Sequence, residues 1–193
     1  PHSKAVLALP VNFIAGKMML IRAIIGRLKL EAVEPGLNMV WSKLSEFTAL
    51  TPHQCSLIFS KHNAFPPTST LLLGGGPVER ELVLKFPDNI DVYEGYGMTE
   101  TLTHVALRKI CGYNLEIPFE ALEGISFRTS SEGKLIIDAP TRNVHSLVTD
   151  DLVELHSATS FTWLGRHSDI INSGGIKFNP SQLEDKLRTV ISH

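Results

Sequence analysis

The first hundred residues alternate between short apolar runs and segments whose apolar residues recur every three to four positions. Short apolar runs predict β-strands, and the longer spacing predicts helices. The predicted strands are residues 5–9, 29–33, 47–50, 69–73 and 91–93, and the predicted helices are residues 16–28, 38–45, 52–61 and 78–86. This alternation favours an α/β fold, a mainly parallel sheet with flanking helices. Ligands bind to such sheets beyond the carboxyl ends of the strands.

A different pattern begins after about residue 104. Short apolar runs separated by turns lie at residues 124–128, 134–138, 152–156 and 161–164. They predict a smaller antiparallel β-sheet or half-barrel. Beyond Gly165, a strand at residues 170–172 and a helix near residues 180–191 predict the start of a C-terminal α+β domain. We therefore expect three parts: residues 1–104, 105–165 and 166–193.

Composition and charge narrow the class of partner. The chain has 193 residues, of which 43% are hydrophobic, and a formal net charge of −2. This balance gives no electrostatic support for nucleic acid or an anionic membrane as the partner. Cys55 and Cys111 lie outside any CxxC pattern, which is typical of reduced thiols in a cytoplasmic protein. The apolar run at residues 18–26 contains Arg22 and is too short for a membrane span.

The stretch richest in candidate chemistry is Tyr93-Glu94-Gly95-Tyr96-Gly97-Met98-Thr99-Glu100-Thr101, which follows a predicted strand. Its glycines permit a close approach of backbone to ligand, and its tyrosines offer a face for a ring. Thr99 can donate to a phosphate oxygen, and Glu100 can bind Mg²⁺, which prefers oxygen ligands. A solvated turn or a helix cap is the alternative interpretation.

A second candidate, Gly74-Gly75-Gly76-Pro77, also follows a predicted strand. Glycines without Cβ atoms let the backbone lie against a flat ring or a phosphate, although a tight turn before a helix has the same composition. The chain contains no Walker-type phosphate loop. No GxGxxG follows a predicted strand, which disfavours a dinucleotide oxidoreductase.

Further candidates lie in the second half. In Thr149-Asp150-Asp151, before a predicted strand, a carboxylate can accept both ribose hydroxyls, and an acidic turn is the alternative. In Gly165-Arg166-His167-Ser168-Asp169, the guanidinium suits ribose or phosphate, and a surface ion pair is the alternative. Lys177 follows paired glycines and can also be simply solvated. The eight histidines show no metal-ligand spacing.

In order and spacing, these motifs resemble the adenylate-forming superfamily of acyl-CoA ligases, luciferases and nonribosomal peptide adenylation domains. Residues 9–23, 161–166 and 171–177 are similar to one branch, the o-succinylbenzoate–CoA ligases of menaquinone biosynthesis. The resemblance implies a ligase that activates a small carboxylate with ATP and Mg²⁺ and then transfers the acyl group from AMP to CoA. It leaves homo-oligomer formation open.

The resemblance also implies roles for residues. The adenylate would be bound by Gly74, Gly75, Gly76, Pro77, Tyr96, Gly97, Met98 and Thr99. Thr99 and Glu100 would serve catalysis, with Glu100 on Mg²⁺, and Asp151 and Arg166 would bind the ribose. Ser168 would lie at an interdomain hinge, and residues 173–177, with Lys177, would face CoA. One departure from the family pattern is Asp150, where many relatives carry glycine. The carboxylate that binds the ribose can therefore lie one residue away from Asp151.

Arg22 and His104 are the candidates for binding the acyl group. His104 follows the signature stretch, and a packed or surface histidine is the alternative. Arg22 interrupts an apolar helical stretch with no carboxylate within four residues of it. Because a buried, unpaired guanidinium is costly, Arg22 pairs either with a distant carboxylate of the chain or with the second carboxylate of a dicarboxylic substrate. An arginine whose head reaches the surface is the third interpretation.

The family's lysine-bearing phosphate loop, expected upstream, and its catalytic lysine, expected downstream, are not in this sequence. We therefore expect a fragment from the middle of a longer enzyme, inactive by itself. Two alternatives remain at this stage. One is another acyl- or aryl-CoA ligase of the same fold, and the other is a noncatalytic nucleotide-binding or assembly domain.

Overall fold

The computed structural model describes residues 3–36, 39, 41, 43–62, 64–110, 117–173, 176–178, 180, 183 and 187. The chain divides into two compact units, Pro1–Ile117 and Pro118–His193. The finer division at residues 104 and 165 stays a prediction. Within the described ranges, no helix combines the length and the apolar character needed to cross a bilayer.

The first unit is built on a sheet with the strand order β2-β1-β3-β4-β5-β6. The strands are β1 (Lys4–Leu7), β2 (Lys29–Ala32), β3 (Ser45–Leu50), β4 (Thr68–Leu73), β5 (Asp91–Gly97) and β6 (His104–Ile110). Neighbours from β2 to β5 pair in parallel, whereas β6 runs antiparallel to β5. The predicted α/β class is therefore confirmed, and the carboxyl ends of the parallel strands meet at one edge.

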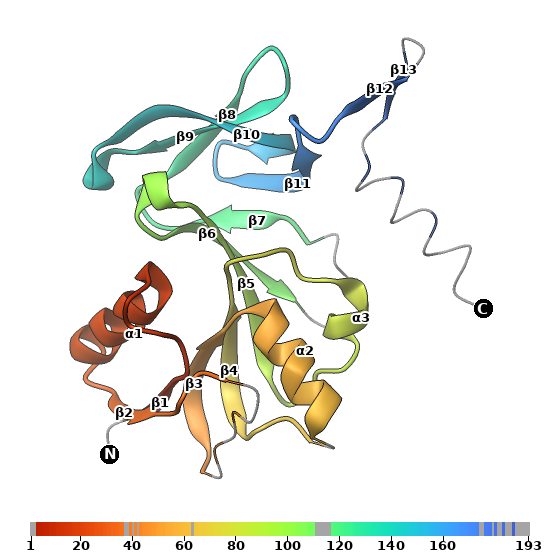
Figure 1. Ribbon diagram of the computed structural model, residues 1–193. Helices are drawn as coiled ribbons and strands as arrows, with labels where there is room; N and C mark the ends of the chain where they lie inside the picture. Colours follow the sequence, from red (N-terminus) through yellow and green to blue (C-terminus); the bar gives the residue numbers. More distant parts are fainter. Residues whose placement is uncertain are drawn as a thin grey trace. The chain divides into compact units, whose positions relative to one another are not determined.

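Helices cover both faces of this sheet (Figure 1). α1 (Ile14–Ile25) packs on the face that carries Tyr93 of β5. α2 (Pro52–Lys61) and α3 (Arg80–Val83) pack on the opposite face, which carries Val92. Successive residues of β5 thus alternate between the two faces, as strand geometry requires. Tyr93 and Gly95 face α1, and Val92 and Glu94 face α2 and α3.

α2 begins where its sequence predicts, with Thr51 as N-cap and Pro52 in the first turn. The Thr51 hydroxyl accepts from the N–H of Gln54 at 3.2 Å, and the Gln54 side chain accepts from the N–H of Thr51 at 2.9 Å. This reciprocal capping box satisfies backbone donors at the helix start. Gln54 also donates to the carbonyl of Ala8 at 2.8 Å. The cap therefore joins the carboxyl ends of β1 and β3.

The helix predicted at residues 38–45 is wrong in the part that the structure describes. Met39, Trp41, Lys43 and Leu44 belong to no helix or strand, and Ser45 already begins β3. Trp41 is buried, and its Nε1 donates to the carbonyl of Pro67 at 2.9 Å. The apolar spacing in this segment therefore anchors an irregular connection to the core.

Two other elements differ in length from the prediction. β5 continues from the predicted strand as far as Gly97, so the first half of the signature stretch is strand rather than loop. The helix predicted at residues 78–86 is limited to the short α3, and residues 84–86 follow as turns in which the N–H groups of Lys85 and Phe86 donate to carbonyls three residues earlier. β6 was not predicted at all, although it supplies the antiparallel neighbour of β5.

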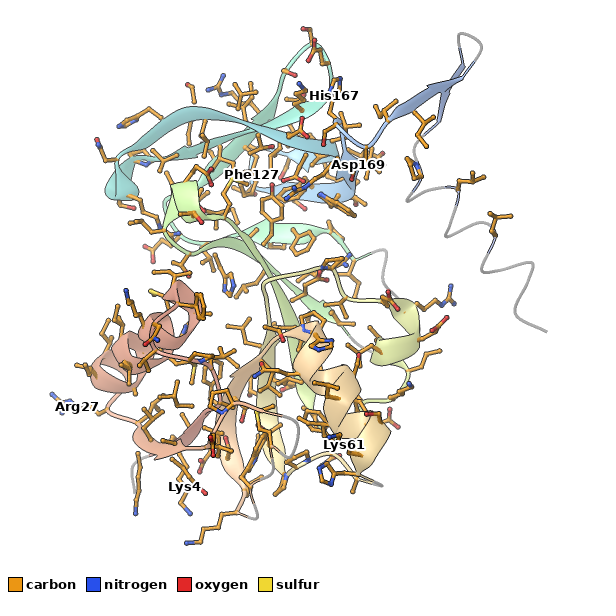
Figure 2. All side chains as sticks on the ribbon, in the orientation of Figure 1. Lys4, Arg27, Lys61, Phe127, His167 and Asp169 are labelled. Atoms are coloured by element: carbon orange, nitrogen blue, oxygen red, sulfur yellow. The ribbon has the colours of Figure 1, made fainter. Side chains whose placement is uncertain are left out.

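The second unit contains the predicted antiparallel sheet, and its strand order is β7-β11-β10-β9-β8. Its strands are β7 (Phe119–Ala121), β8 (Ser126–Thr129), β9 (Lys134–Ala139), β10 (Val144–Ser157) and β11 (Ser160–Arg166). Phe127, labelled in Figure 2, is fully buried, and its ring centroid lies 4.9 Å from that of Phe161. Because β10 begins at Val144, Asp151 lies within a strand and not before one.

The last described segments are β12 (Ile171–Ser173) and β13 (Ile176–Phe178), which pair with each other. Pro180, Leu183 and Leu187 are helical, in agreement with the helix predicted near residues 180–191. The remaining residues of that helix, and the glycine turn at residues 174–175, lie outside the described residues.

Candidate functional site

Two glycine-containing segments lie side by side at the carboxyl edge of the first unit. Gly74 directly follows β4, and Gly95 lies on the neighbouring strand β5. The register pairs Leu73 with Glu94, so the next residue of each strand is Gly74 and Gly95. The structure thus brings together the two segments that the sequence singled out separately.

The imidazole of His104 lies across both glycines. A Cβ built on Gly74 would be 2.8 Å from Nε2 of His104, and a Cβ built on Gly95 would be 2.7 Å from Cε1. Neither position can carry a side chain while the ring stays there. The ring that occupies the space over Gly74 is therefore the imidazole of His104, a side chain of the protein itself, and it lies on the α1 face of the sheet.

The loop Gly74-Gly75-Gly76-Pro77, called the 74–77 loop below, is fixed at its start and open on its outer side. The N–H of Gly74 donates to the carbonyl of Leu50 at 3.2 Å. Gly75 has φ +84°, a conformation that favours glycine. Nothing lies within 4 Å of a Cβ built on Gly76, and Gly75, Gly76 and Pro77 are exposed. A ligand can therefore approach this backbone.

The turn after β5 is held by Thr101, whose side chain is fully buried. Its hydroxyl oxygen accepts from the N–H of Met98 at 3.1 Å and donates to the carbonyl of Thr103 at 2.9 Å. With the turn fixed in this way, Thr99 and Glu100 are exposed in the short 3-10 helix Thr99–Thr101. Sequence reasoning missed the role of Thr101, although it is the second threonine of the signature stretch.

The side chains that could bind a metal ion suit Mg²⁺ better than an ion held entirely by protein ligands. No group of three or more His, Cys, Asp or Glu side chains gathers within the described part of the chain. Glu100 is a single exposed carboxylate. Mg²⁺ keeps several waters and commonly takes its other ligands from one or two carboxylates and from substrate phosphates. Glu100 could therefore hold Mg²⁺ together with a bound nucleotide.

A buried ion pair close to this edge was not anticipated from the sequence. Glu94 and Arg108 are opposite each other on β5 and β6, with Nε and Nη2 of Arg108 at 2.7 and 2.6 Å from Oε2 of Glu94. Burial raises the pKa of Glu94, while Arg108 and the N–H of Val78 oppose that rise. The sequence signal was the alternation itself, since Glu94 falls two residues after the inward-facing Val92.

The two ribose candidates lie opposite each other on β10 and β11 of the second unit. Nε of Arg166 is 3.6 Å from Oδ1 of Asp151, and Nε1 of Trp163 donates to the same oxygen at 3.0 Å. Asp151 is 6% exposed, whereas the Arg166 side chain is 63% exposed. The structure therefore joins a fixed carboxylate to an accessible guanidinium, a combination that suits vicinal hydroxyls.

Asp150 has a different environment from its neighbour. Its Oδ2 accepts from the N–H of Ser168 at 3.1 Å, and the side chains of Lys134 and His167 approach Oδ1 at 4.0 Å. Hydrogen bonds from Ser168 hold the pKa of Asp150 below its usual value. Asp150 thus fixes the turn after β11, where Figure 2 labels His167 and Asp169. These contacts favour Asp151 over Asp150 as the ribose candidate.

Arg22 is half-buried on α1, and burial lowers the pKa of its guanidinium. No ion pair among the described residues includes Arg22. Its helix packs on the same face of the sheet as Gly95 and the ring of His104. Lys177 lies on β13 opposite Asn172, and its side chain is outside the described residues.

No family model matches the chain. Among curated proteins, the 2-succinylbenzoate–CoA ligase of Bacillus cereus (strain AH820) is 30% identical over a 145-residue alignment, which covers 61% of this chain and 30% of that protein. The corresponding ligase of Bacillus mycoides (strain KBAB4) is 28% identical with the same coverage. The chain therefore spans less than a third of the length of these curated relatives.

Two solved structures are also similar to the chain. An acyl-CoA synthetase (AMP-forming)/AMP-acid ligase II-like protein from Dyadobacter fermentans is 33% identical with a TM-score of 0.75, covering 100% of this chain and 57% of that one. The o-succinylbenzoate–CoA synthetase (MenE) of Bacillus subtilis, solved with ATP and magnesium, is 19% identical with a TM-score of 0.72, covering 96% and 46%. At that identity the second likeness shows the fold alone.

These similarities confirm the resemblance to the adenylate-forming enzymes, whose α/β architecture the first unit shares. Within that class, the chain is similar to the 2-succinylbenzoate–CoA ligases and to an AMP-forming acyl-CoA synthetase.

Proposed function

We propose that the chain carries the adenylate-binding part of an ATP-dependent acid–CoA ligase, and that its acid is o-succinylbenzoate, activated in menaquinone biosynthesis. In such a ligase, a carboxylate attacks the α-phosphate of ATP and releases pyrophosphate. The thiolate of CoA then displaces AMP from the acyl-adenylate and forms the thioester. Preorganised positive charge stabilises the charge that develops in both steps.

The observation that carries this proposal is the meeting of the 74–77 loop with the end of β5. Both segments are open to solvent on their outer sides, and the ring of His104 touches the glycines of both. In the proposal, the residues that contact the adenylate are Gly74, Gly75, Gly76, Pro77, Tyr96, Gly97, Met98 and Thr99. Glu100 holds Mg²⁺, which neutralises phosphate charge, while Thr99 donates to a phosphate oxygen.

The second unit carries its own candidate contacts. Asp151 accepts hydrogen bonds from the ribose hydroxyls, and Arg166 donates to ribose or phosphate. Lys177 belongs to the segment that faces CoA. On the first unit, Arg22 and His104 serve the acyl group, because both lie on the α1 face of the sheet. The planar guanidinium of Arg22 suits a carboxylate that the reaction with ATP does not consume.

A ligase for another acid is the second candidate. It is favoured by the Dyadobacter acyl-CoA synthetase, which is 33% identical over the whole of this chain. A noncatalytic nucleotide-binding domain is the third, and it predicts binding of AMP without turnover. Calorimetry with non-hydrolysable adenylates separates the first two: we expect an o-succinylbenzoyl-adenylate analogue to bind more tightly than aliphatic acyl-adenylate analogues, and Arg22→Leu to abolish this preference while sparing AMP.

Gly76→Val tests the nucleotide site directly. A Cβ at Gly76 meets nothing within 4 Å, so the variant should fold normally while its branched side chain blocks the ligand's path. Gly75 is less suitable because its φ of +84° would strain any side chain. We expect titration calorimetry to show AMP binding to the unaltered chain and its loss in Gly76→Val. Gly36→Val is the matched control, because Gly36 is equally unobstructed. Equal AMP affinity in both variants would exclude the 74–77 loop.

Glu100→Gln tests the metal assignment. The change keeps the size and the exposed position of the side chain but removes its charge. We expect the Mg²⁺-dependent gain in ATP affinity to fall about tenfold or more, with AMP binding in the absence of Mg²⁺ unchanged. Glu123→Gln, at an exposed position of the second unit, serves as the control. An undiminished Mg²⁺ effect in Glu100→Gln would remove Glu100 from the metal site.

A further inference from the structure

The ladder between β10 and β11 contains a β-bulge next to Asp151. Leu152 pairs with Gly165, but the next residue of β10, Val153, pairs with Trp163. β11 therefore holds one more residue than β10 at this point. Gly165 has φ +128°, a conformation that a residue with a side chain rarely adopts. The glycine of this motif thus permits the bulge.

The bulge decides to which face of the sheet Trp163 points. Asp151 and Val153 share one face because they are two residues apart on a strand, and Trp163 shares it as the partner of Val153. In a regular ladder, Trp163 would lie one position further along and point to the opposite face. Arg166 is the direct partner of Asp151 and points to the same face. The bulge therefore brings Trp163 and Arg166 to the same carboxylate, although they are three residues apart in the chain.

Trp163 and Arg166 contact that carboxylate in different ways. The indole Nε1 of Trp163 donates to Oδ1 of Asp151 at 3.0 Å. Nε of Arg166 lies 3.6 Å from the same oxygen, which is too long for a hydrogen bond, and the Arg166 side chain is 63% exposed. The indole is a rigid, half-buried plane with a single donor. It can fix the orientation of the carboxylate, whereas the guanidinium can still turn toward a ligand.

The main chain of Asp151 is fixed from the other side. Its N–H donates to the hydroxyl oxygen of Thr149 at 3.1 Å, and this hydroxyl donates to the carbonyl of Leu135 on β9 at 3.0 Å. Thr149 is itself buried. The main chain of Asp151 is therefore attached to β9 and its side chain to β11, so that both strands determine where the carboxylate lies.

We propose that Trp163 is a positioning residue, whose indole N–H orients the Asp151 carboxylate to accept hydrogen bonds from the ribose hydroxyls of a bound nucleotide. Trp163 touches no ligand in this proposal. The ribose contact rests on the proposed function, whereas the hydrogen bond from Trp163 to Asp151 does not. The competing explanation is a tryptophan that stabilises the sheet by packing alone.

Removal of the N–H without loss of the ring separates the two explanations. Trp163→Phe keeps an aromatic ring and withdraws the donor. A second chain carries benzothienylalanine at position 163, in which sulfur takes the place of the N–H and the size of the indole is retained. This chain provides the test if Trp163→Phe fails to fold. Trp41→Phe is the matched control, because Nε1 of Trp41 donates to the carbonyl of Pro67 in the first unit.

The first readout is hydrogen exchange of the indole N–H groups. Trp41 and Trp163 are the two tryptophans of the chain, so each gives its own indole resonance. We expect Asp151→Ala to accelerate exchange at Trp163 about tenfold or more and to leave Trp41 unchanged, because only Trp163 loses a charged acceptor. Equal exchange at Trp163 with and without the Asp151 carboxylate would overturn the proposal.

The second readout is the preference for AMP over dideoxy-AMP, which lacks both ribose hydroxyls, measured by titration calorimetry. Loss of packing would weaken both ligands alike, whereas loss of positioning weakens AMP alone. We expect both chains altered at position 163 to reduce the ratio of the two affinities about fivefold, and Trp41→Phe to leave the ratio unchanged. A ratio that stays the same in the chains altered at position 163 would show that Trp163 does not position the ribose ligand.

Failure of the proposed function gives a different result. If the unaltered chain binds AMP and dideoxy-AMP equally, or binds neither, Asp151 is not a ribose ligand and the ribose part of this proposal falls with that assignment. The indole exchange then decides alone whether Trp163 holds the Asp151 carboxylate.

Discussion

Two adjacent aspartates on β10 show how one residue step changes the chemistry of a carboxylate. Asp151 is buried beside Trp163 and Arg166, whereas Asp150 is exposed and accepts from Ser168. Strand alternation sends the two side chains to opposite faces. The sequence left open which of them serves the ribose, and only the cross-strand contacts distinguish them.

Asp150 should titrate below the usual range of an aspartate, since hydrogen bonds from Ser168 favour its charged form. Because its folded pKa is depressed, its contribution to stability is present above the unfolded pKa and is lost as the pH falls through the folded pKa. We expect Ser168→Ala to move the pKa part of the way back, because the backbone N–H remains. Carboxyl ¹³C NMR titration measures this, with Ser69→Ala as control. An Asp150 pKa unchanged by Ser168→Ala would contradict the assignment.

α2 is the element whose sequence specifies its start most completely. Its N-cap, its proline and its capping partner all lie within four consecutive residues, Thr51 to Gln54. We expect Thr51→Ala to lower the stability of this region by about 1 kcal/mol. Cys55 in the first turns of α2 offers a probe, since it is fully buried and burial raises the pKa of its thiol.

Labelling of the Cys55 thiol can follow the local opening of α2. In a Cys111→Ser background, in which Cys55 is the one remaining cysteine, labelling by a thiol reagent should require local opening. We expect Thr51→Ala to accelerate it about fivefold, in line with the loss of the cap. Ser60→Ala is the control, because the Ser60 hydroxyl donates only to the carbonyl of Leu57 at the other end of the helix. Equal rates in the two variants would contradict the role of the cap.

Among the helices and strands, the sequence predicted the features that depend on a local pattern of residues. It missed the features that depend on pairing with residues distant in the chain. Strands such as β4 and the start of α2 follow from apolar runs and capping residues close together in the chain. β6 was missed because its apolar residues are interrupted by Arg108 and Lys109, and Arg108 is explained only by Glu94 across the ladder. Trp41 misled the helix prediction because its partner, the Pro67 carbonyl, is distant in sequence.

Among the residues that the structure describes, the outer face of α1 carries the largest group of exposed apolar side chains. Its large apolar side chains Phe13, Ile14, Leu20, Ile21, Ile24 and Ile25 are all exposed, the last two by 76% and 79%. Beside them lies an open depression of about 740 Å³, lined mainly by Leu20, Ala23, Ile24, Leu28 and Leu30. Contiguous apolar surface of this kind favours association with other apolar surfaces.

We expect the isolated chain to associate with itself as its concentration rises, and Ile24→Gln/Ile25→Gln to suppress this. Because both side chains already face water, the stability of the fold should change by about 0.5 kcal/mol or less. Analytical ultracentrifugation over a range of concentrations measures the association. Leu84→Gln/Val148→Gln is the matched control, since these apolar residues are exposed singly. Equal suppression by both pairs would assign the association to general hydrophobicity and not to α1.

The ring of His104 over Gly74 and Gly95 ties three positions together in any future redesign of this chain. A methyl group at either glycine is blocked for as long as position 104 carries a ring, so libraries that vary these sites one at a time will discard useful variants. A combinatorial library that first shortens residue 104 opens both strands to side chains at once. The volume vacated by the imidazole can then be filled by two new side chains or left open for a larger ligand.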